Sequence, residues 1–302
     1  MNSRRVDLIG AAIGLGGRCL GSRGGPAAIR AAGVARALAR GGRVVRDRGD
    51  VVAREAARLP GRDAGPAVAA EVARFSLELR AQVEASLDEG ALALVLGGDH
   101  ALGAATQAAV GRWARRTGRA APGLLWIDAH TDANTMETTP SGNLHGMMLA
   151  ALHGLDVPAF REVVAGGGRD PRRTVYIGTR DVDDGEREIV ARLGCRIYAP
   201  EEIRARGAAE VAREALAIAG GSDGLVSASF DLDCLDPAVA PGVDCHVPGG
   251  LGWEEVEPIL AAVGAWPGLV QVEVVEVNPE ADDADGRTAR LAVAAAALLC
   301  GG

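Results

Sequence analysis

The stretch GLLWIDAHTDAN, residues 123–134, joins a short apolar run to a dense group of acidic and histidine side chains. The apolar part has the length and composition of a buried β-strand. Similar runs recur along the chain and alternate with longer segments that are rich in Ala and Arg. Continuous apolar strands between helices predict a parallel sheet that helices cover on both faces.

Eight such units are expected. We expect strands at 6–12, 44–46, 91–96, 123–128, 174–178, 195–198, 225–231 and 269–277. We expect helices at 26–40, 67–89, 101–116, 143–154, 185–193, 201–219, 253–264 and 285–300. This order fits either an open doubly wound sheet or a closed barrel. No tandem repeat or low-complexity linker divides the chain, so residues 1–302 are expected to form one domain, with surface loops at 60–66 and 166–171.

The N-terminal stretch VDLIGAAIGLGG, residues 6–17, resembles the apolar part of a signal peptide. Asp7 interrupts its apolar run, and glycines follow at once. A first strand and a glycine loop are therefore the preferred interpretation.

Composition excludes several classes of protein. The chain has 302 residues, 40 acidic residues and 32 basic ones, all of which are Arg, so its formal net charge is −8. Hydrophobic residues make up 48% and aromatic ones 3%, which disfavours both disorder and binding to nucleic acid. No uncharged apolar stretch reaches the roughly 18 residues of a membrane-spanning helix, so no membrane partner is expected. The five cysteines are scattered without a CxxC pair, which indicates free thiols in a reducing compartment and a cytoplasmic location.

Acidic and histidine residues follow four of the expected strands. His100 comes after strand 91–96, and Glu276 closes strand 269–277. The two other clusters are Asp128, His130 and Asp132 after strand 123–128, and Asp231 and Asp233 at the end of strand 225–231. Ligands bind outside the carboxyl ends of the strands in open α/β sheets. All four clusters are therefore expected at one rim.

The spacing of these residues indicates a metal site. Residues i and i+2 of an extended chain share a face, so Asp128, His130 and Asp132 converge if the chain stays extended, and Asp231 and Asp233 stand in the same relation. Like charges at this density raise one another's pKa unless a multivalent cation is present. Two imidazoles with four carboxylates suit a borderline-hard divalent metal such as manganese.

Several neighbouring residues also have a purely structural interpretation. Asp99 and Asp236 are expected to cap turns or helices. Cys234 points away from the ligand candidates by strand alternation, so core packing is favoured for it, and a structural role is favoured for His153. His145 either relays a proton at neutral pH or makes a hydrogen bond at a helix terminus.

The motifs GGDH (97–100), DAHTDAN (128–134), SGNLHG (141–146), RDVDDGE (180–186), SFDLDCLDP (229–237) and EVNPE (276–280) occur in this order. As an ordered set they resemble the ureohydrolase family and are most similar to the arginases. The resemblance runs from RGGPAAIRAAG at 23–33 to the last helix. It implies a three-layer α/β/α fold with an eight-stranded parallel sheet, and a homo-oligomer that is a trimer or a hexamer.

The resemblance also implies a binuclear site with two Mn²⁺ per chain. One ion would be held by His100, Asp128, Asp132 and Asp231, and the other by His130, Asp128, Asp231 and Asp233. The implied reaction is the hydrolysis of L-arginine to L-ornithine and urea, through attack of a metal-bridging hydroxide on the guanidinium carbon.

Three residues are expected to carry this chemistry. Glu276 would orient the guanidinium, and His145 would deliver a proton to the departing amine or relay one from solvent. Asp128 could also pass on the proton of the attacking hydroxide, as could Asp233, and the residues alone leave these routes open.

Substrate choice is expected to depend on a polar shell. Asn134, Ser141 and Asn143 match the arginase positions that hold the α-carboxylate, and Asp183 matches the position that faces the α-amino group. Thr139 and Glu186 match further positions of the substrate shell. For the residues of the polar loop, turn formation is the alternative interpretation.

One segment departs from the arginase pattern. Val243-Asp244-Cys245-His246 stands where arginases have a Thr-Gly-Thr-Pro stretch. Asp244 or His246 could narrow the site, add a charge or favour a modified guanidine, or both could point to solvent. Ala101 also replaces a usual Ser, with no evident chemical consequence. Two further hypotheses therefore remain: hydrolysis of another guanidino compound, such as agmatine, guanidinobutyrate or N-hydroxy-L-arginine, and a catalytically silent protein that acts by binding or assembly.

Overall fold

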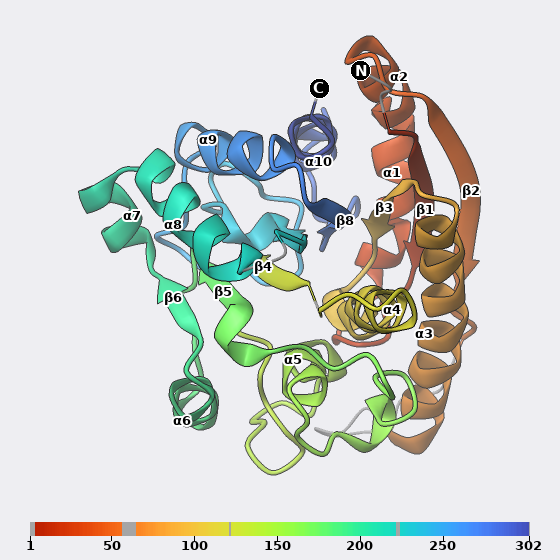
Figure 1. Ribbon diagram of the computed structural model, residues 1–302, viewed down its shortest axis with the longest axis vertical. Coiled ribbons are helices and arrows are strands. Elements are labelled where there is room, and N and C mark those ends of the chain that lie inside the picture. Colours follow the sequence, from red (N-terminus) through yellow and green to blue (C-terminus); the bar gives the residue numbers. More distant parts are fainter. Residues whose placement is uncertain (1–3, 56–64, 121, 222–223, 302) are drawn as a thin grey trace.

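One parallel sheet of eight strands forms the centre of the fold, in the order β2-β1-β3-β8-β7-β4-β5-β6 (Figure 1). The computed structural model describes residues 4–55, 65–120, 122–221 and 224–301. The strands are β1 (Val6–Ala12), β2 (Val45–Val52), β3 (Leu92–Gly97), β4 (Gly123–Ile127), β5 (Thr174–Ile177), β6 (Arg196–Tyr198), β7 (Val226–Asp231) and β8 (Leu269–Val275). Because β2 and β6 are edge strands, the sheet is open, and the barrel alternative is excluded.

Helices cover both faces of this sheet, as the pattern of apolar runs predicts (Figure 1). One face packs against α1 (Gly25–Ala31), α2 (Val34–Arg40), α7 (Pro200–Arg206), α8 (Ala208–Gly220), α9 (Trp253–Gly264) and α10 (Arg287–Leu299). The other packs against α3 (Gly65–Asp88), α4 (Gly103–Arg116), α5 (Met148–Leu152) and α6 (Asp184–Leu193). Two apolar cores therefore lie on either side of the sheet, which confirms the three-layer α/β/α architecture.

Two of the predicted helices are each divided in two. The segment predicted as 26–40 breaks between α1 and α2 at Gly33, where φ is +98°. The segment predicted as 201–219 breaks between α7 and α8 at Gly207, where φ is +93°. A positive φ interrupts the helical backbone, and glycine adopts it without steric cost, so the continuous-helix predictions were wrong at these glycines.

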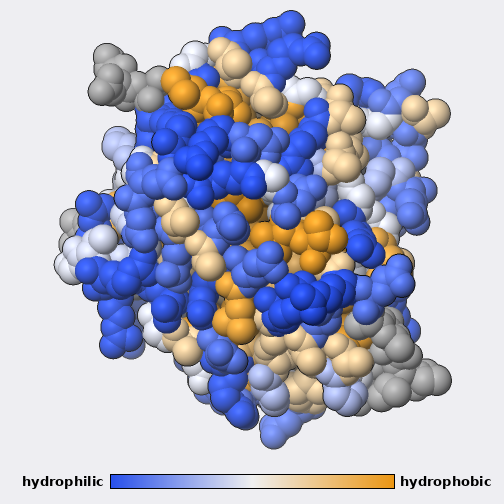
Figure 2. All heavy atoms as spheres, turned by 90° about the vertical axis from the view of Figure 1, so that its right-hand side faces the viewer, coloured by the Kyte–Doolittle hydropathy of each residue, from blue (hydrophilic) through white to orange (hydrophobic). Residues whose placement is uncertain are grey.

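Strand β2 extends beyond the predicted 44–46. The prediction was too short because β2 is an edge strand. Half of the residues in its sequence, VRDRGDVV, are charged and most are exposed, so it lacks the apolar pattern that marks the inner strands. Arg48 ion-pairs with buried Asp7 of β1 at 2.6 Å. Charged side chains on an edge oppose pairing with further strands. Figure 2 shows this side of the molecule, where hydrophilic side chains surround smaller apolar patches.

The four strands that carry the predicted clusters are neighbours at the centre of the sheet, in the order β3-β8-β7-β4. All pairings are parallel, so their carboxyl ends lie at one rim, as predicted. The predicted first strand at 6–12 is β1, and 166–170 is irregular, whereas most of the predicted loop at 60–66 lies outside the described residues. Within the described ranges, no helix is both long and apolar enough to cross a bilayer.

Candidate metal centre and active site

Short turns after the central strands bring the histidine and aspartate side chains together. After β3, Asp99 accepts the backbone N–H of Ala101 at 2.9 Å and caps a 3-10 turn that begins at His100. After β7, Asp231 accepts the backbone N–H of Asp233 at 2.8 Å and caps a second turn. After β4, Asp128 accepts the backbone N–H of His130 at 2.7 Å. The Oδ1 atoms of Asp128 and Asp231 thus hold the turns by accepting backbone N–H groups. Their Oδ2 atoms stay available to bind a cation.

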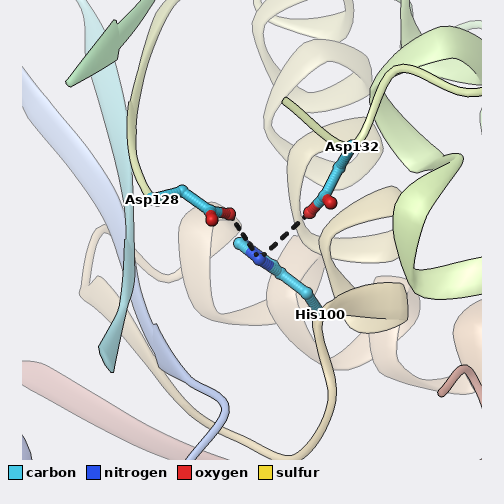
Figure 3. A group of neighbouring side chains, drawn as sticks. All are labelled: His100, Asp128 and Asp132. Carbon is cyan, nitrogen blue, oxygen red and sulfur yellow. Dashed lines mark ion pairs between the residues drawn. The ribbon is translucent and has the colours of Figure 1, made fainter. Parts of the chain in front are cut away.

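The first group of side chains surrounds His100 (Figure 3). The Nδ1 atom of His100 lies 3.0 Å from Asp128 Oδ2, 3.3 Å from Asp132 Oδ2 and 3.0 Å from Asp231 Oδ2. Neighbouring ligands of one ion lie at about this separation when the bonds to the ion are roughly 2.1 Å long. Neither His100 Nδ1 nor Asp128 Oδ2 has a hydrogen-bond partner among the described residues. Buried polar atoms of this kind are expected at a metal site.

The second group surrounds His130 and shares Asp128 with the first. His130 Nδ1 lies 3.1 Å from Asp233 Oδ2 and 3.4 Å from Asp128 Oδ1. The two oxygens of Asp128 therefore face different histidines. This arrangement can hold two cations that share a bridging carboxylate.

The electrostatics of the cluster also favour a cation. Burial and the charge of Asp128 raise the pKa of Asp132 well above its usual value, and burial with the charges of Asp233 and Asp128 does the same for Asp231. Burial opposes protonation of His100, but the carboxylates beside it, Asp128 first among them, outweigh it and raise its pKa to about 9. Without a cation the cluster therefore gathers protons, because the buried carboxylates repel one another.

A cavity of about 230 Å³ opens onto this cluster. Its wall contains every site residue predicted from the sequence except Asp128, which lies fully buried behind it. The residues predicted from five separate segments of the chain (100, 128–145, 183–186, 231–233 and 276) therefore converge on one place.

His145 and Glu276 meet at the cavity wall. The Nδ1 atom of His145 lies 3.3 Å from Glu276 Oε1, which also accepts the backbone N–H of His100 at 2.7 Å. Glu276 Oε2 is buried and has no hydrogen-bond partner within the described residues. Burial acts to lower the pKa of His145, but the hydrogen bond and charge of Glu276 raise it above its usual value. The pair thus offers a free carboxylate oxygen beside an imidazole that readily holds a proton.

The polar loop lines the cavity and also makes internal turns. Thr139 Oγ1 accepts the backbone N–H of Gly142 at 3.0 Å, and Ser141 Oγ accepts that of Asn143 at 3.2 Å. Asn134 donates through Nδ2 to Asp183 Oδ2 at 2.9 Å. Turn formation and a substrate-facing position are therefore compatible in this loop.

Glu186 has a clear supporting role in addition to its place in the cavity wall. Its Oε1 accepts the backbone N–H of Ala133 at 2.9 Å, and its Oε2 accepts that of Asp183 at 3.1 Å. It thus ties the loop after β4 to the start of α6.

In segment 243–246, which departs from the arginase pattern, Cys245 lines the cavity, whereas Asp244 and His246 do not. Asp244 accepts a hydrogen bond from Asn278 Nδ2 at 2.6 Å, and His246 is exposed, with Nε2 at 2.8 Å from the Pro241 carbonyl. Of the alternatives left open for Asp244 and His246, an added charge in the cavity wall is therefore not what the structure shows, because local partners hold both side chains elsewhere and His246 points to solvent. Cys245 was not predicted as a site residue, and its place between these two residues was the available signal.

The structural interpretations of the other residues are confirmed. Asp99 caps a turn, as described above, and Asp236 accepts the backbone N–H groups of Ala238 and Gly249 at 3.0 and 2.9 Å. Cys234 is fully buried in the core beneath the sheet. His153 ends α5 and lies outside the cavity wall.

Comparisons with known proteins agree with this geometry. A family profile described as "Arginase family" matches residues 4–301. An arginase from Bacillus caldovelox is 36% identical over 98% of both chains, and its solved structure gives a TM-score of 0.88 over 99% of both chains at 35% identity. An Entamoeba histolytica arginase in complex with L-ornithine gives a TM-score of 0.89 at 26% identity and covers both chains completely. A hypothetical agmatinase from Burkholderia thailandensis gives 0.74 at 28% identity over 98% of this chain and 85% of that one.

Proposed function

The chain belongs to the arginase family, and we propose that it hydrolyses L-arginine to L-ornithine and urea with two Mn²⁺ ions. It is a hydrolase that acts on a guanidino C–N bond. The observation that carries the proposal is the pair of residue groups that share Asp128, with His100 on one side and His130 on the other. The retained cluster argues against a catalytically silent protein.

The donor set fits two divalent ions. A site with histidine nitrogen and carboxylate oxygen donors, and without a thiolate, is better suited to manganese than to a soft metal. His100, Asp132 and Asp231 would hold one ion, His130 and Asp233 the other, with Asp128 and Asp231 as bridges. Buried atoms without hydrogen-bond partners, among them His100 Nδ1 and Asp128 Oδ2, support this assignment.

Two bound divalent ions supply Lewis-acid activation of water near neutral pH. The residues of the chain then bind the substrate and move protons. Glu276 Oε2 is free to accept the guanidinium N–H groups, and its negative charge orients the cation in the cavity. The raised pKa of His145 favours the protonated imidazole, from which a proton can pass to the departing amine. Asp128 or Asp233 would carry the proton that the attacking water loses.

Recognition of the amino-acid head supports arginine as the substrate. Asn134, Ser141 and Asn143 place neutral donors along the cavity wall, and Asp183 adds a carboxylate there. Neutral donors suit an α-carboxylate, and a carboxylate suits an α-ammonium group. Thr139 and Glu186 would complete this shell, Glu186 mainly by fixing Asp183 and the loop after β4.

Hydrolysis of another guanidino compound is the second candidate, and two observations favour it. The agmatinase-like structure shares the fold, and the cavity wall contains Cys245 in the segment that departs from the arginase pattern. Agmatine, guanidinobutyrate and N-hydroxy-L-arginine belong in the same assay. Cys245 is the residue of that segment that lines the cavity, and burial keeps its thiol neutral. The segment therefore adds no charge that would repel arginine.

We also propose one catalytic domain over residues 1–302, a cytoplasmic location and a homo-oligomer that is a trimer or a hexamer. The placement of β1 and β8 on either side of β3 supports the single domain, because the two halves of the chain share one sheet. The family resemblance supports the oligomer, which the mass in solution from light scattering would test.

Urea release tests the proposal. Purified protein is stripped with a chelator, dialysed and reloaded with Mn²⁺, and metal content is measured beside urea formation from L-arginine. We expect about two ions per chain, loss of activity after stripping and recovery with Mn²⁺. Protein that holds two ions and forms no urea from L-arginine would overturn the substrate assignment, and protein that binds no metal would overturn the metal assignment.

A further inference from the structure

A row of polar side chains crosses the two central strands β7 and β8 directly behind the candidate metal centre. Ser229 of β7 and Glu273 of β8 are paired in register, and two residues earlier Ser227 and Gln271 are paired in the same way. All four are fully buried. Burial of polar side chains in inner strands is costly unless each has partners, so this row calls for an explanation.

The row touches the metal-ligand candidate His100 from behind. His100 Nε2 lies 2.8 Å from Ser229 Oγ and 4.0 Å from Glu273 Oε1. The ring also stacks on Trp126, with centroids 4.0 Å apart and planes 6° from parallel. If Nδ1 uses its lone pair for a cation, Nε2 must carry the hydrogen and donate it toward these oxygens. The contacts therefore define both the tautomer and the orientation of the ring.

The row continues away from His100 to the buried guanidinium of Arg169. Glu273 Oε2 accepts from Gln271 Nε2 at 3.1 Å, and Gln271 Oε1 accepts from Gln107 Nε2 at 3.1 Å. Ser227 Oγ donates to Gln107 Oε1 at 2.7 Å and accepts from Arg169 Nη2 at 2.5 Å. A carboxylate and a guanidinium thus stand at the two ends of a chain of neutral groups.

Arg169 keeps its charge at this buried position. Its residue is 5% exposed, and burial lowers the pKa of its guanidinium to about 9, which still leaves it protonated at neutral pH. Glu273 is the carboxylate that opposes this shift. The two charges therefore act on each other through the polar row.

Glu273 Oε1 has no hydrogen-bond partner among the described residues. An unsatisfied buried carboxylate oxygen is costly, and the positive group nearest to it would be the imidazole of His100 with a cation at Nδ1. Carboxylates behind metal-bound histidines fix the ring and increase its basicity. The polar row is thus best satisfied when His100 holds a metal.

We propose that Glu273 is a positioning residue for the metal centre. With Ser229 it holds the His100 ring through Nε2, and Arg169 balances its charge from the far end of the row. This inference rests on the proposed metal site at His100 and goes beyond it, because neither Glu273 nor Arg169 lines the cavity.

Two serines of one strand provide a matched test. Ser229→Ala removes the oxygen that faces His100 Nε2, whereas Ser227→Ala makes the same change two residues earlier in the same row, away from His100. Glu273→Gln keeps the shape and removes the charge. The full-length protein is stripped, and Mn²⁺ binding is followed by the electron paramagnetic resonance signal of free and bound ions, beside the melting temperature.

We expect Ser229→Ala and Glu273→Gln to weaken one of the two Mn²⁺ sites by roughly 10- to 100-fold. At intermediate Mn²⁺ their spectra would show single ions where the parent protein shows a coupled pair. Ser227→Ala would lower the melting temperature but leave both affinities within about twofold of the parent. If Glu273→Gln does not fold, the contrast between the two serine variants decides.

The proposal is overturned if Ser229→Ala binds both ions like the parent, or if Ser227→Ala weakens Mn²⁺ binding equally. A parent protein that binds no Mn²⁺ would instead overturn the proposed metal site. For Arg169, the melting temperatures of Arg169→Met, Glu273→Gln and the double variant are compared after stripping. We expect the melting temperature of the double variant to fall by less than the sum of the two single falls, because each single variant leaves one charge unbalanced. Additive falls would show that Arg169 does not balance the charge of Glu273.

Discussion

Asp132 and Glu276 share an unusual backbone conformation: their φ angles are +48° and +62°, and no other non-glycine residue in the described ranges has a positive φ. Both line the cavity. Such conformations cost on the order of 1–3 kcal/mol each and persist where the surrounding structure holds them. The chain thus carries backbone strain at the two positions where its proposed metal ligand and its proposed guanidinium partner stand.

Asp132→Asn should stabilise the metal-free protein and weaken metal binding. Burial and the charge of Asp128 raise the pKa of Asp132 in the folded state, so this carboxyl lowers folding stability at pH values above its unfolded pKa. The amide removes that cost, and we expect the melting temperature of stripped protein at pH 8 to rise by a few degrees. Mn²⁺ affinity should fall at least about 10-fold. The exposed Glu188→Gln is the control, and a stripped variant less stable than the parent would contradict the prediction.

Asp183→Asn should impair recognition of the substrate head without disturbing the fold. Asp183 is the N-cap of α6, and Asn caps helices as well as Asp does. The variant therefore removes the charge that we assign to the α-amino group and keeps the cap. We expect KM for L-arginine to rise about 10-fold with little change in kcat, and a melting temperature near that of the parent. An unchanged KM would remove Asp183 from the substrate shell.

Cys245→Thr should leave the hydrolysis of L-arginine nearly intact. Burial raises the pKa of the Cys245 thiol far above neutral, so the cavity wall presents a neutral group in either protein. We expect kcat/KM within about threefold of the parent, a difference under 1 kcal/mol, whereas Cys245→Asp should lose at least about 100-fold because it adds a charge beside Glu276 and the cluster. A large loss in Cys245→Thr would mean that the thiol itself takes part in the reaction.

His153 should make the protein sensitive to mild acid. Both of its ring nitrogens are buried, and burial lowers its pKa to about 4. The unfolded chain binds this proton near pH 6.5, so stability is fully present above that pH, falls as the pH drops toward 4 and then levels off. His153→Gln should reduce this loss by up to about 3 kcal/mol.

Urea unfolding of parent and His153→Gln proteins at pH 7.5, 6.0, 5.0 and 4.5 measures the effect. Both are stripped of metal beforehand, because the metal centre has an acid sensitivity of its own. Parallel stability curves for the two proteins would show that His153 does not titrate as its burial requires.

The sequence predicts the inner part of this fold well because most of the inner strands are apolar runs. Strand β1 and helix α9 have the predicted bounds. Edge strand β2 was underestimated because its charged residues face solvent, and the helix breaks at Gly33 and Gly207 depend on backbone angles that apolar periodicity does not encode. The apolar pattern alone left open whether the strands form an open sheet or a closed barrel, because closure depends on tertiary packing.

The site was predictable where residues sit at strand ends, because parallel strands end at one rim. The partners of loop side chains were not: Asp244 turns to Asn278, and Cys245 enters the cavity wall instead. Glu273 was also missed. The alternation of Val with Gln and Glu in VQVEV, residues 270–274, was the available signal, because polar residues are unexpected in a central strand that is buried on both faces.

The kcat/KM of the Mn²⁺-loaded protein for L-arginine relative to agmatine tests the central claim most directly. Both substrates carry the guanidinium that Glu276 would orient, but only arginine carries the α-carboxylate that Asn134, Ser141 and Asn143 would hold. We predict that arginine leads by at least about 100-fold, which corresponds to roughly 2.7 kcal/mol of transition-state stabilisation from the head group. Equal values, or a lead for agmatine, would contradict the assignment of this cavity to L-arginine.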